Sequence, residues 1–149
     1  MIVFLGADHG GFTVKERLKI ELVQAGFEVE DMGAVLLEPD DDYPVYGQKV
    51  ALKVAQSPED RGVLLCRSGH GMAIVANKVA GVRAVLATTG AWTEASRVDD
   101  DANVLAIGVD YMAQEAILPL VLAWLKTPFA GERHGRRLGE ITTLENQKI

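Results

Sequence analysis

Residues 62–71 read GVLLCRSGHG, and this stretch decides the fold. The run 62–66 is apolar without interruption, as expected for a β-strand that is covered on both faces. The polar, glycine-containing segment 67–71 then marks a turn, and the residues after it predict a helix over 72–78. A buried strand that enters a helix through a tight turn is typical of α/β proteins with a parallel sheet.

The same alternation continues in both directions along the chain. Apolar, β-branched runs predict further strands at residues 1–5, 27–31, 82–87 and 103–107. Amphipathic patterns predict helices at residues 14–22, 46–56, 91–98 and 113–126, the last of them bent or started at Pro119, and a final helix from about Arg133. No linker or internal repeat divides the chain, so we expect one doubly wound α/β domain over residues 1–149.

The composition and the net charge of the chain disfavour several classes of protein. The 149 residues are 48% hydrophobic and 24% charged, which is the balance of a globular protein. A net charge of −6 disfavours nucleic-acid binding through charge alone, and the longest apolar run, 116–125, reaches about half of a membrane span. The single cysteine excludes an internal disulfide and cysteine-pair zinc motifs. We therefore expect a cytoplasmic protein without nucleic-acid or membrane partners.

The only thiol, Cys66, stands where a predicted strand ends and a helix begins. Glycines there let the backbone approach a ligand closely, and the N–H groups and dipole of a helix start favour negative charge. The same field favours a thiolate, which is able to act as a base beside an anion-binding loop. The alternative is that Cys66 is a small buried hydrophobic residue. Phosphate hydrolysis through a Cys-x5-Arg loop is disfavoured, because Met72 stands at the arginine position.

Asp8 and His9 follow the first predicted strand, at the edge of the sheet where such folds bind ligands. His9 is a candidate anion ligand or proton carrier. Asp8 is a candidate for orienting His9 or for binding ligand hydroxyls, and its alternative role is to cap the next helix. The segments 88–90 and 108–110 end other predicted strands at the same edge.

A basic cluster at residues 133–137 is unusual in an acidic chain. Arg133 and Arg137 are four residues apart, so on a helix both face the same side and together suit a phosphate. The alternative is a solvent-exposed face that pairs with Glu132 and Glu140. The acidic triplets 40–42 and 99–101 lack the ligand spacing of a known metal loop, so we interpret them as solvated turns and expect no metal site.

Together these segments resemble the ribose-5-phosphate isomerase B family, which also contains galactose-6-phosphate isomerase subunits. The resemblance rests on GADHGG at 6–11, DYP at 42–44, LLCRSGHGMAIVANKVAGVRA at 64–84, NVLAIG at 103–108 and GERHGRR at 131–137. It implies a single Rossmann-like, three-layer αβα domain with a five-stranded parallel sheet. It also implies a homodimer or homotetramer with active sites between subunits, and a metal-independent, cofactor-free aldose–ketose isomerase of a sugar phosphate, by default ribose 5-phosphate and ribulose 5-phosphate.

The resemblance also implies roles by position. Cys66 is implied as the base that moves a proton between C1 and C2, Ser68 as a residue of sugar ring opening, and the backbone N–H groups of the turn as the cradle of a cis-enediolate. The implied catalytic residues are thus Cys66, Ser68 and Asp99. The implied binding residues are Asp8 and Tyr43 for the sugar, His9, Arg133 and Arg137 for the phosphate, and Arg67, Gly69, His70 and Gly71 in the turn.

Two positions depart from the family pattern. Asp99 stands where the family usually has a histidine that helps to open the sugar ring, and Asp110 stands where an arginine is often found. Arg67 replaces a common glycine and is placed to restore the missing positive charge, while His70 is placed to share in proton transfer. These departures favour, as alternatives, a different tetrose or hexose substrate, or a sugar-phosphate-binding protein without activity.

Overall fold

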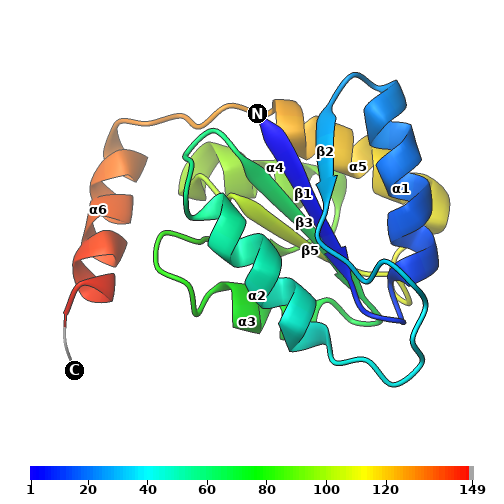
Figure 1. The fold of residues 1–149 in the computed structure, drawn as a ribbon. Helices are drawn as coiled ribbons and strands as arrows, with labels where there is room; N and C mark the ends of the chain where they lie inside the picture. Colours follow the sequence, from blue (N-terminus) through cyan, green and yellow to red (C-terminus); the bar gives the residue numbers. More distant parts are fainter. Residues whose placement is uncertain (148–149) are drawn as a thin grey trace.

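Five parallel strands form the centre of the fold, in the order β2-β1-β3-β5-β4 (Figure 1). The computed structural model describes residues 1–147, so the last two residues of the expected domain lie outside it. The strands are β1 (Ile2–Ala7), β2 (Glu28–Asp31), β3 (Arg61–Cys66), β4 (Ala84–Leu86) and β5 (Val104–Gly108). The prediction of an α/β fold with a five-stranded parallel sheet is therefore confirmed.

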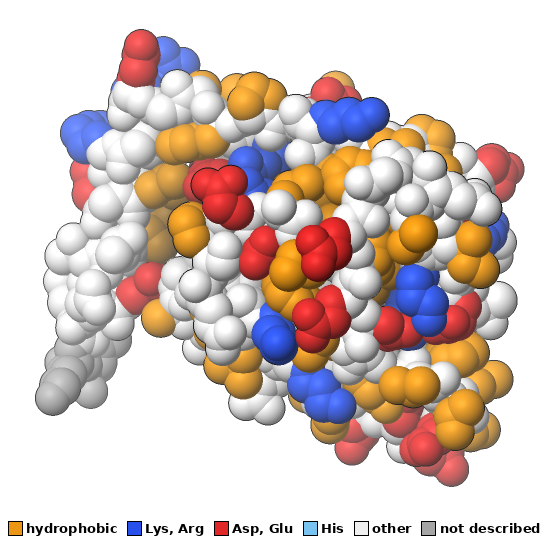
Figure 2. Space-filling model, turned by 45° about the horizontal axis from the view of Figure 1, so that its top comes forward, with side chains coloured by type: hydrophobic (Ala, Val, Ile, Leu, Met, Phe, Trp, Pro, Cys, Tyr) orange, Lys and Arg blue, Asp and Glu red, His pale blue; other side chains and the backbone are white. Residues whose placement is uncertain are grey.

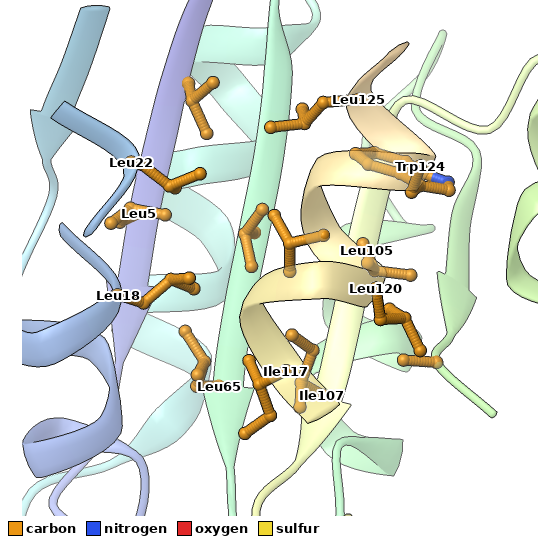
Figure 3. Close-up of a cluster of buried hydrophobic side chains, with 14 of the residues drawn as sticks. Leu5, Leu18, Leu22, Leu65, Leu105, Ile107, Ile117, Leu120, Trp124 and Leu125 are labelled. Carbon is orange, nitrogen blue, oxygen red and sulfur yellow. The ribbon is translucent and has the colours of Figure 1, made fainter. Parts of the chain in front are cut away.

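Helices cover both faces of this sheet and make three layers. They are α1 (Phe12–Gln24), α2 (Tyr43–Val54), α3 (His70–Ala76), α4 (Gly90–Asp100) and α5 (Gln114–Lys126). Helix α6 (Arg133–Glu145) stands beside the body instead (Figure 1). Successive strand residues point to opposite faces. Leu5 and Leu65 accordingly pack with α1 and α5 (Figure 3), while Phe4 and Leu64 pack with α2 and α3. Each face thus has a hydrophobic core of its own.

The strand order makes the position between β1 and β3 different from the other positions in the sheet. The chain moves from β1 to one edge of the sheet and from β3 toward the other edge, so its direction reverses between these two strands. Ligands of such sheets bind beyond the strand ends at this reversal. Because Ala7 pairs in register with Leu65, the loops that follow β1 and β3 begin side by side.

Two helices contain a proline at a position that the helix tolerates, and in both the start of the helix differs from what the proline suggested. Helix α2 begins at Tyr43 rather than at residue 46, since Pro44 fits the first turn, where its missing N–H costs no hydrogen bond. Helix α5 starts at Gln114 and continues past Pro119, so the proline does not start it. The longer α2 brings Tyr43 to the carboxyl edge of the sheet.

The predicted turn at residues 99–101 is wrong for its first two residues. Helix α4 continues through Asp100, and only Asp101, with a φ of 45°, ends it. Arg97 and Arg83 bind the Asp101 carboxylate at 2.6 and 2.9 Å, and these contacts hold the residue in a left-handed conformation. Asp99 therefore projects from the last turn of a helix.

A buried lysine joins α1 to the loop after β2. Lys15 is fully buried, and its Nζ lies 2.7 Å from both carboxylate oxygens of Asp31 and 2.8 Å from the Ala34 carbonyl. Burial alone would raise the pKa of Asp31, but hydrogen bonds from Lys15 and Lys19 lower it to about 2. The loop held in this way also pairs with the end of β1, where Ala7 N–H donates to the Gly33 carbonyl at 2.8 Å.

We expect Lys15→Met to lower the free energy of unfolding by about 3 kcal/mol, because Asp31 keeps only Lys19 of its two lysine partners and the Ala34 carbonyl loses its donor. Lys53→Met is the matched control, since Lys53 forms an exposed pair with Glu30 at 3.4 Å. Such a pair contributes about 0.5 kcal/mol. Urea unfolding measures both variants, and equal losses would contradict the importance of the buried pair.

Candidate active site

Two loops meet at the carboxyl edge of the sheet, one after β1 and one after β3. A Cβ atom on Gly11 would lie 2.4 Å from the carbonyl oxygen of Leu65, and one on Gly10 would lie 2.7 Å from Cγ of Arg67. Only glycine allows contacts this close. The loops at 8–11 and 67–71 therefore form one continuous surface.

Cys66 ends β3 with its Sγ facing the start of α3. The Gly69 N–H donates a hydrogen bond to Sγ, with an N–S distance of 3.0 Å. Cys66 is only 6% exposed and belongs to the core cluster that contains Leu64 and Met72. The structure thus agrees with the interpretation of Cys66 as a small buried hydrophobic residue, and its hydrogen bond with Gly69 places the sulfur at the glycine turn. The role of Cys66 as a base stays a prediction.

A cavity of about 470 Å³ opens beside this turn. Its polar walls are Ser68 and His70 from the turn and Thr88 and Thr89 from the loop after β4, together with Gly108 at the end of β5 and Tyr111 after it. Cys66 is not one of the lining residues. An apolar cavity with a few hydroxyl groups fits a small polar ligand.

Asp41, in the loop before α2, binds His9. The backbone N–H and the Nδ1 of His9 both lie 2.8 Å from the same Asp41 Oδ1. This hydrogen bond raises the pKa of His9, and burial opposes it only in part. Burial would raise the pKa of Asp41, but hydrogen bonds with His9 and the nearby Tyr46 lower it. His9 therefore favours its cationic form and keeps Nε2 available to a ligand.

Asp8 contacts the loop after β1, and Tyr43 contacts the loop after β3. Asp8 is 7% exposed, and its Oδ1 accepts a hydrogen bond from the Gly11 N–H at 3.1 Å, just before α1. Asp8 thus closes the turn before α1 but does not cap this helix, because Gly11 occupies the N-cap position and no side chain makes a capping bond, so the alternative interpretation of Asp8 as a helix cap is wrong. The Tyr43 ring covers Gly71, where a Cβ atom would lie 2.5 Å from the ring. Gly71 is therefore held against an aromatic wall.

Arg67 and Asp110 lie together on the turns after β3 and β5. Arg67 Nη1 is 3.7 Å from Asp110 Oδ2, and the two side chains are 69% and 49% exposed. The positive charge of Arg67 also acts on His9, where it lowers the pKa by less than Asp41 raises it. Arg67 is thus close to Asp110 and near enough to His9 to affect its pKa.

Asp99 lies far from this cluster within one chain. Helix α4 starts at the carboxyl edge and runs away from it, so its eleven residues carry Asp99 roughly 15 Å from that edge. The start of α6 lies beside this distant end, with His134 Nε2 3.6 Å from Asp99 Oδ1. Figure 1 shows α6 on the opposite side of the molecule from the loops after β1 and β3.

Arg133 and Arg137 are carried on α6 and so share this distant position. Both are exposed, and within residues 1–147 neither has an acidic side chain at ion-pair distance. Arg136 instead pairs with Glu140 at 2.5 Å. The alternative interpretation of the cluster as a salt-bridged surface therefore holds for Arg136 alone, and the two arginines singled out are available to an external anion.

Two residues beside the predicted site, Asp41 and His134, have no clear signature in the sequence. The prediction of a solvated turn at residues 40–42 is wrong for Asp41, whose side chain is 5% exposed and bound to His9. His134 is 8% exposed and faces Asp99. Both contacts join segments that are more than 30 residues apart, so neither local spacing nor propensity indicates them.

Two kinds of feature are missing from the part of the chain that the structure describes. Within residues 1–147, no three histidine, cysteine or acidic side chains are grouped so that they suit a metal ion. None of the helices in this range combines the length and the apolar character that crossing a bilayer requires.

The chain is similar to known isomerases over nearly its whole length. The profile of the ribose/galactose isomerase family matches residues 3–141. Ribose-5-phosphate isomerase B of Escherichia coli strain K12 is 40% identical over 146 residues, which are 98% of this chain and 97% of that protein. Ribose-5-phosphate isomerase B of Mycoplasma genitalium, solved with bound ribulose-5-phosphate, is 34% identical and covers 99% of this chain and 97% of its own, with a TM-score of 0.95. The Clostridium thermocellum isomerase B is 40% identical, with 97% of each chain covered and a TM-score of 0.91.

We expect Gly69→Ala to be more harmful than Gly81→Ala, although the two glycines have φ angles of 77° and 79°. Left-handed strain costs both variants about 1–2 kcal/mol. Only at Gly69 does the new Cβ meet neighbours, Leu86 Cδ1 at 2.5 Å and the Gly108 nitrogen at 3.0 Å. This overlap adds about 1–3 kcal/mol. Urea unfolding tests the difference, and equal losses would show that the turn has room for a side chain.

Proposed function

Because the chain belongs to the ribose/galactose isomerase family, we propose that it interconverts ribose 5-phosphate and ribulose 5-phosphate without a metal or cofactor. The observation that carries this proposal is the match over 99% of the chain to an isomerase solved with ribulose-5-phosphate. Residues 1–149 act as a single isomerase domain. The protein works in the cytoplasm, where reducing conditions keep its only cysteine, Cys66, as a free thiol.

Proton transfer between C1 and C2 is the task of Cys66. Its thiolate takes the C2 proton of the open-chain aldose, the electron pair of that bond forms the C1–C2 double bond, and the π pair of the C1 carbonyl moves onto O1 to give a cis-enediolate. The thiol then returns the proton to C1, while the O2 hydroxyl proton passes to O1 and C2 becomes the ketone. The contact of Sγ with the Gly69 N–H supports this role, because it puts the sulfur beside the amides that would hold the negative oxygen.

The other candidates divide between ring opening and binding. Ser68 and Asp99 assist ring opening, and Asp8 and Tyr43 contact the sugar. The phosphate is bound by His9, Arg133 and Arg137. Arg67, Gly69, His70 and Gly71 complete the turn that receives the substrate. Ser68 and His70 support this assignment most directly, since both line the cavity beside Cys66.

The site is completed by a second copy of the chain, so we propose a homodimer or homotetramer with shared sites. Cys66 lies at the carboxyl edge of the sheet, whereas Asp99 lies at the end of α4 that points away from this edge. Arg133 and Arg137 are on α6, whose His134 is 3.6 Å from Asp99. A symmetric pair of chains brings such separated groups together.

The surface of α6 supports this assembly. Ile141 and Leu144 are 46% and 59% exposed, and Ile74 and Trp92 on the body are 62% and 72% exposed. Figure 2 shows α6 as an arm beside the body, with apolar side chains in the hollow between them. A second chain that covers these side chains would remove apolar surface from water.

The Arg67–Asp110 pair favours a second candidate, the same reaction on another sugar phosphate. Asp110 adds negative charge near the edge where a phosphate would bind, and charge repulsion weakens such a site. Turnover of a tetrose or hexose phosphate in preference to ribose 5-phosphate would favour this candidate. Comparison of purified protein on these substrates decides between the two.

We expect Cys66→Ala to lower kcat for ribose 5-phosphate about a hundredfold or more, because it removes the base. Val63→Ala is the packing control, since Val63 is buried in the same strand and takes no part in the proposed chemistry. Activity assays at saturating substrate, with thermal unfolding to confirm the fold, measure the effect. If wild type and Cys66→Ala turn over ribose 5-phosphate equally slowly, the assignment is wrong.

Mixing two inactive variants tests the shared site. The first carries Cys66→Ala and the second carries both Arg133→Ala and Arg137→Ala. After subunit exchange, we expect about a quarter of wild-type activity, because half of the dimers contain one intact site of two. No recovery in a mixture whose exchange is confirmed by mass spectrometry would place all groups in one chain. A monomeric mass of wild type in light scattering would also contradict the proposal.

A further inference from the structure

Two hydrogen bonds join His9 to Asp41, one from the backbone and one from the imidazole ring. One oxygen of Asp41 accepts from both the backbone N–H and the Nδ1 of His9, each at 2.8 Å. The Asp41 side chain is 5% exposed, whereas that of His9 is 31% exposed. Asp41 thus lies behind the imidazole, and His9 presents its other side to the edge of the sheet.

This arrangement fixes which nitrogen of His9 a ligand meets. A carboxylate at Nδ1 orients the ring and requires a proton on that nitrogen, so Nε2 is the nitrogen that remains for a ligand. The second oxygen of Asp41, Oδ2, is buried and has no hydrogen-bond partner within the described residues. His9 is therefore the residue that Asp41 binds through two hydrogen bonds, while Tyr46 also helps to lower the pKa of the Asp41 carboxyl.

The charges around His9 come from several elements. Asp41 and Asp8 favour the cation, and Arg67, from the turn after β3, opposes it. Tyr46, from α2, lies near Asp41, and burial first and Asp41 second raise the pKa of its phenol. The net effect on His9 is a raised pKa, whose largest cause is the hydrogen bond with Asp41.

We propose that Asp41 is a positioning residue that holds His9 as an imidazolium, so that His9 binds the phosphate of the substrate through Nε2 as a cation. This inference rests on the proposed function and specifies how that site supplies positive charge within one chain. A protonated imidazole forms a charge-assisted hydrogen bond to phosphate, which a neutral imidazole does not.

The pH dependence follows from the sign of the shift. Because the pKa of His9 is raised, the His9–Asp41 pair stabilises the folded chain fully below the ordinary value of 6.5 and loses this effect as the pH rises through the raised pKa. Phosphate binding is lost over the same range. Removing the charge of Asp41 moves both losses to lower pH.

The decisive variant is Asp41→Asn, because its amide oxygen still accepts the bonds from His9 while the charge is gone. Asp40→Asn is the matched control, an exposed carboxylate lost from the same loop. Above neutral pH, we expect Asp41→Asn to raise KM for ribose 5-phosphate about five- to tenfold with kcat within about twofold. Asp40→Asn is expected to leave both constants within about twofold.

Two measurements separate this inference from the proposed function. Histidine NMR, with His9 assigned through His9→Gln, measures the pKa of His9 in each variant and its response to inorganic phosphate. A lower pKa and a weaker phosphate response in Asp41→Asn are expected even if ribose 5-phosphate is not the substrate. An unchanged pKa of His9 overturns the inference. So does a KM effect of Asp41→Asn that persists in the His9→Gln background, since it would then not act through His9.

Discussion

The contact of Gly11 with the carbonyl of Leu65 is the constraint on which the rest of the site depends. It allows the start of α1 to lie directly against β3, and Gly10 repeats this closeness against Arg67. Because the two strands are in register, the loops after them become one surface, at the reversal of the sheet where ligands bind. A side chain at either glycine would separate His9 from the turn that holds Cys66.

Periodicity and glycine placement predicted the sheet, the order of the elements and the functional edge. The apolar runs that become β1, β3 and β5 are buried on both faces, so their local signal is strong. Helix ends were less predictable, since Pro44 lies in the first turn of α2 and Asp101 ends α4 only because two arginines bind it. Hydrogen bonds between distant segments decide such details.

The candidate site was predictable to a similar extent. Cys66, Ser68 and His70 lie in or beside the turn that borders the cavity, as a strand-to-helix motif indicates. Asp41 was not predictable, because its contact with His9 spans 32 residues and its neighbours in the triplet are exposed. The distance of Asp99 from Cys66 follows from the direction of α4, which a motif comparison by position does not reveal.

The two carboxylates that we interpreted as departures from the family pattern have partners in the structure. Asp110 faces Arg67, and Asp99 faces His134, so neither carboxylate stands alone. The first pair lies at the carboxyl edge and the second lies where α6 begins. The chemistry is thus distributed over two ends of the molecule.

Helix α6 gives this distribution a consequence for the behaviour of the enzyme in dilute solution. It is joined to the body through residues 127–132, and within residues 1–147 only His134 of the helix is buried. In the assembly that we propose, this arm completes the active site of a second chain. The catalytic rate per chain would then depend on protein concentration by mass action and would fall on dilution below the dissociation constant of the assembly.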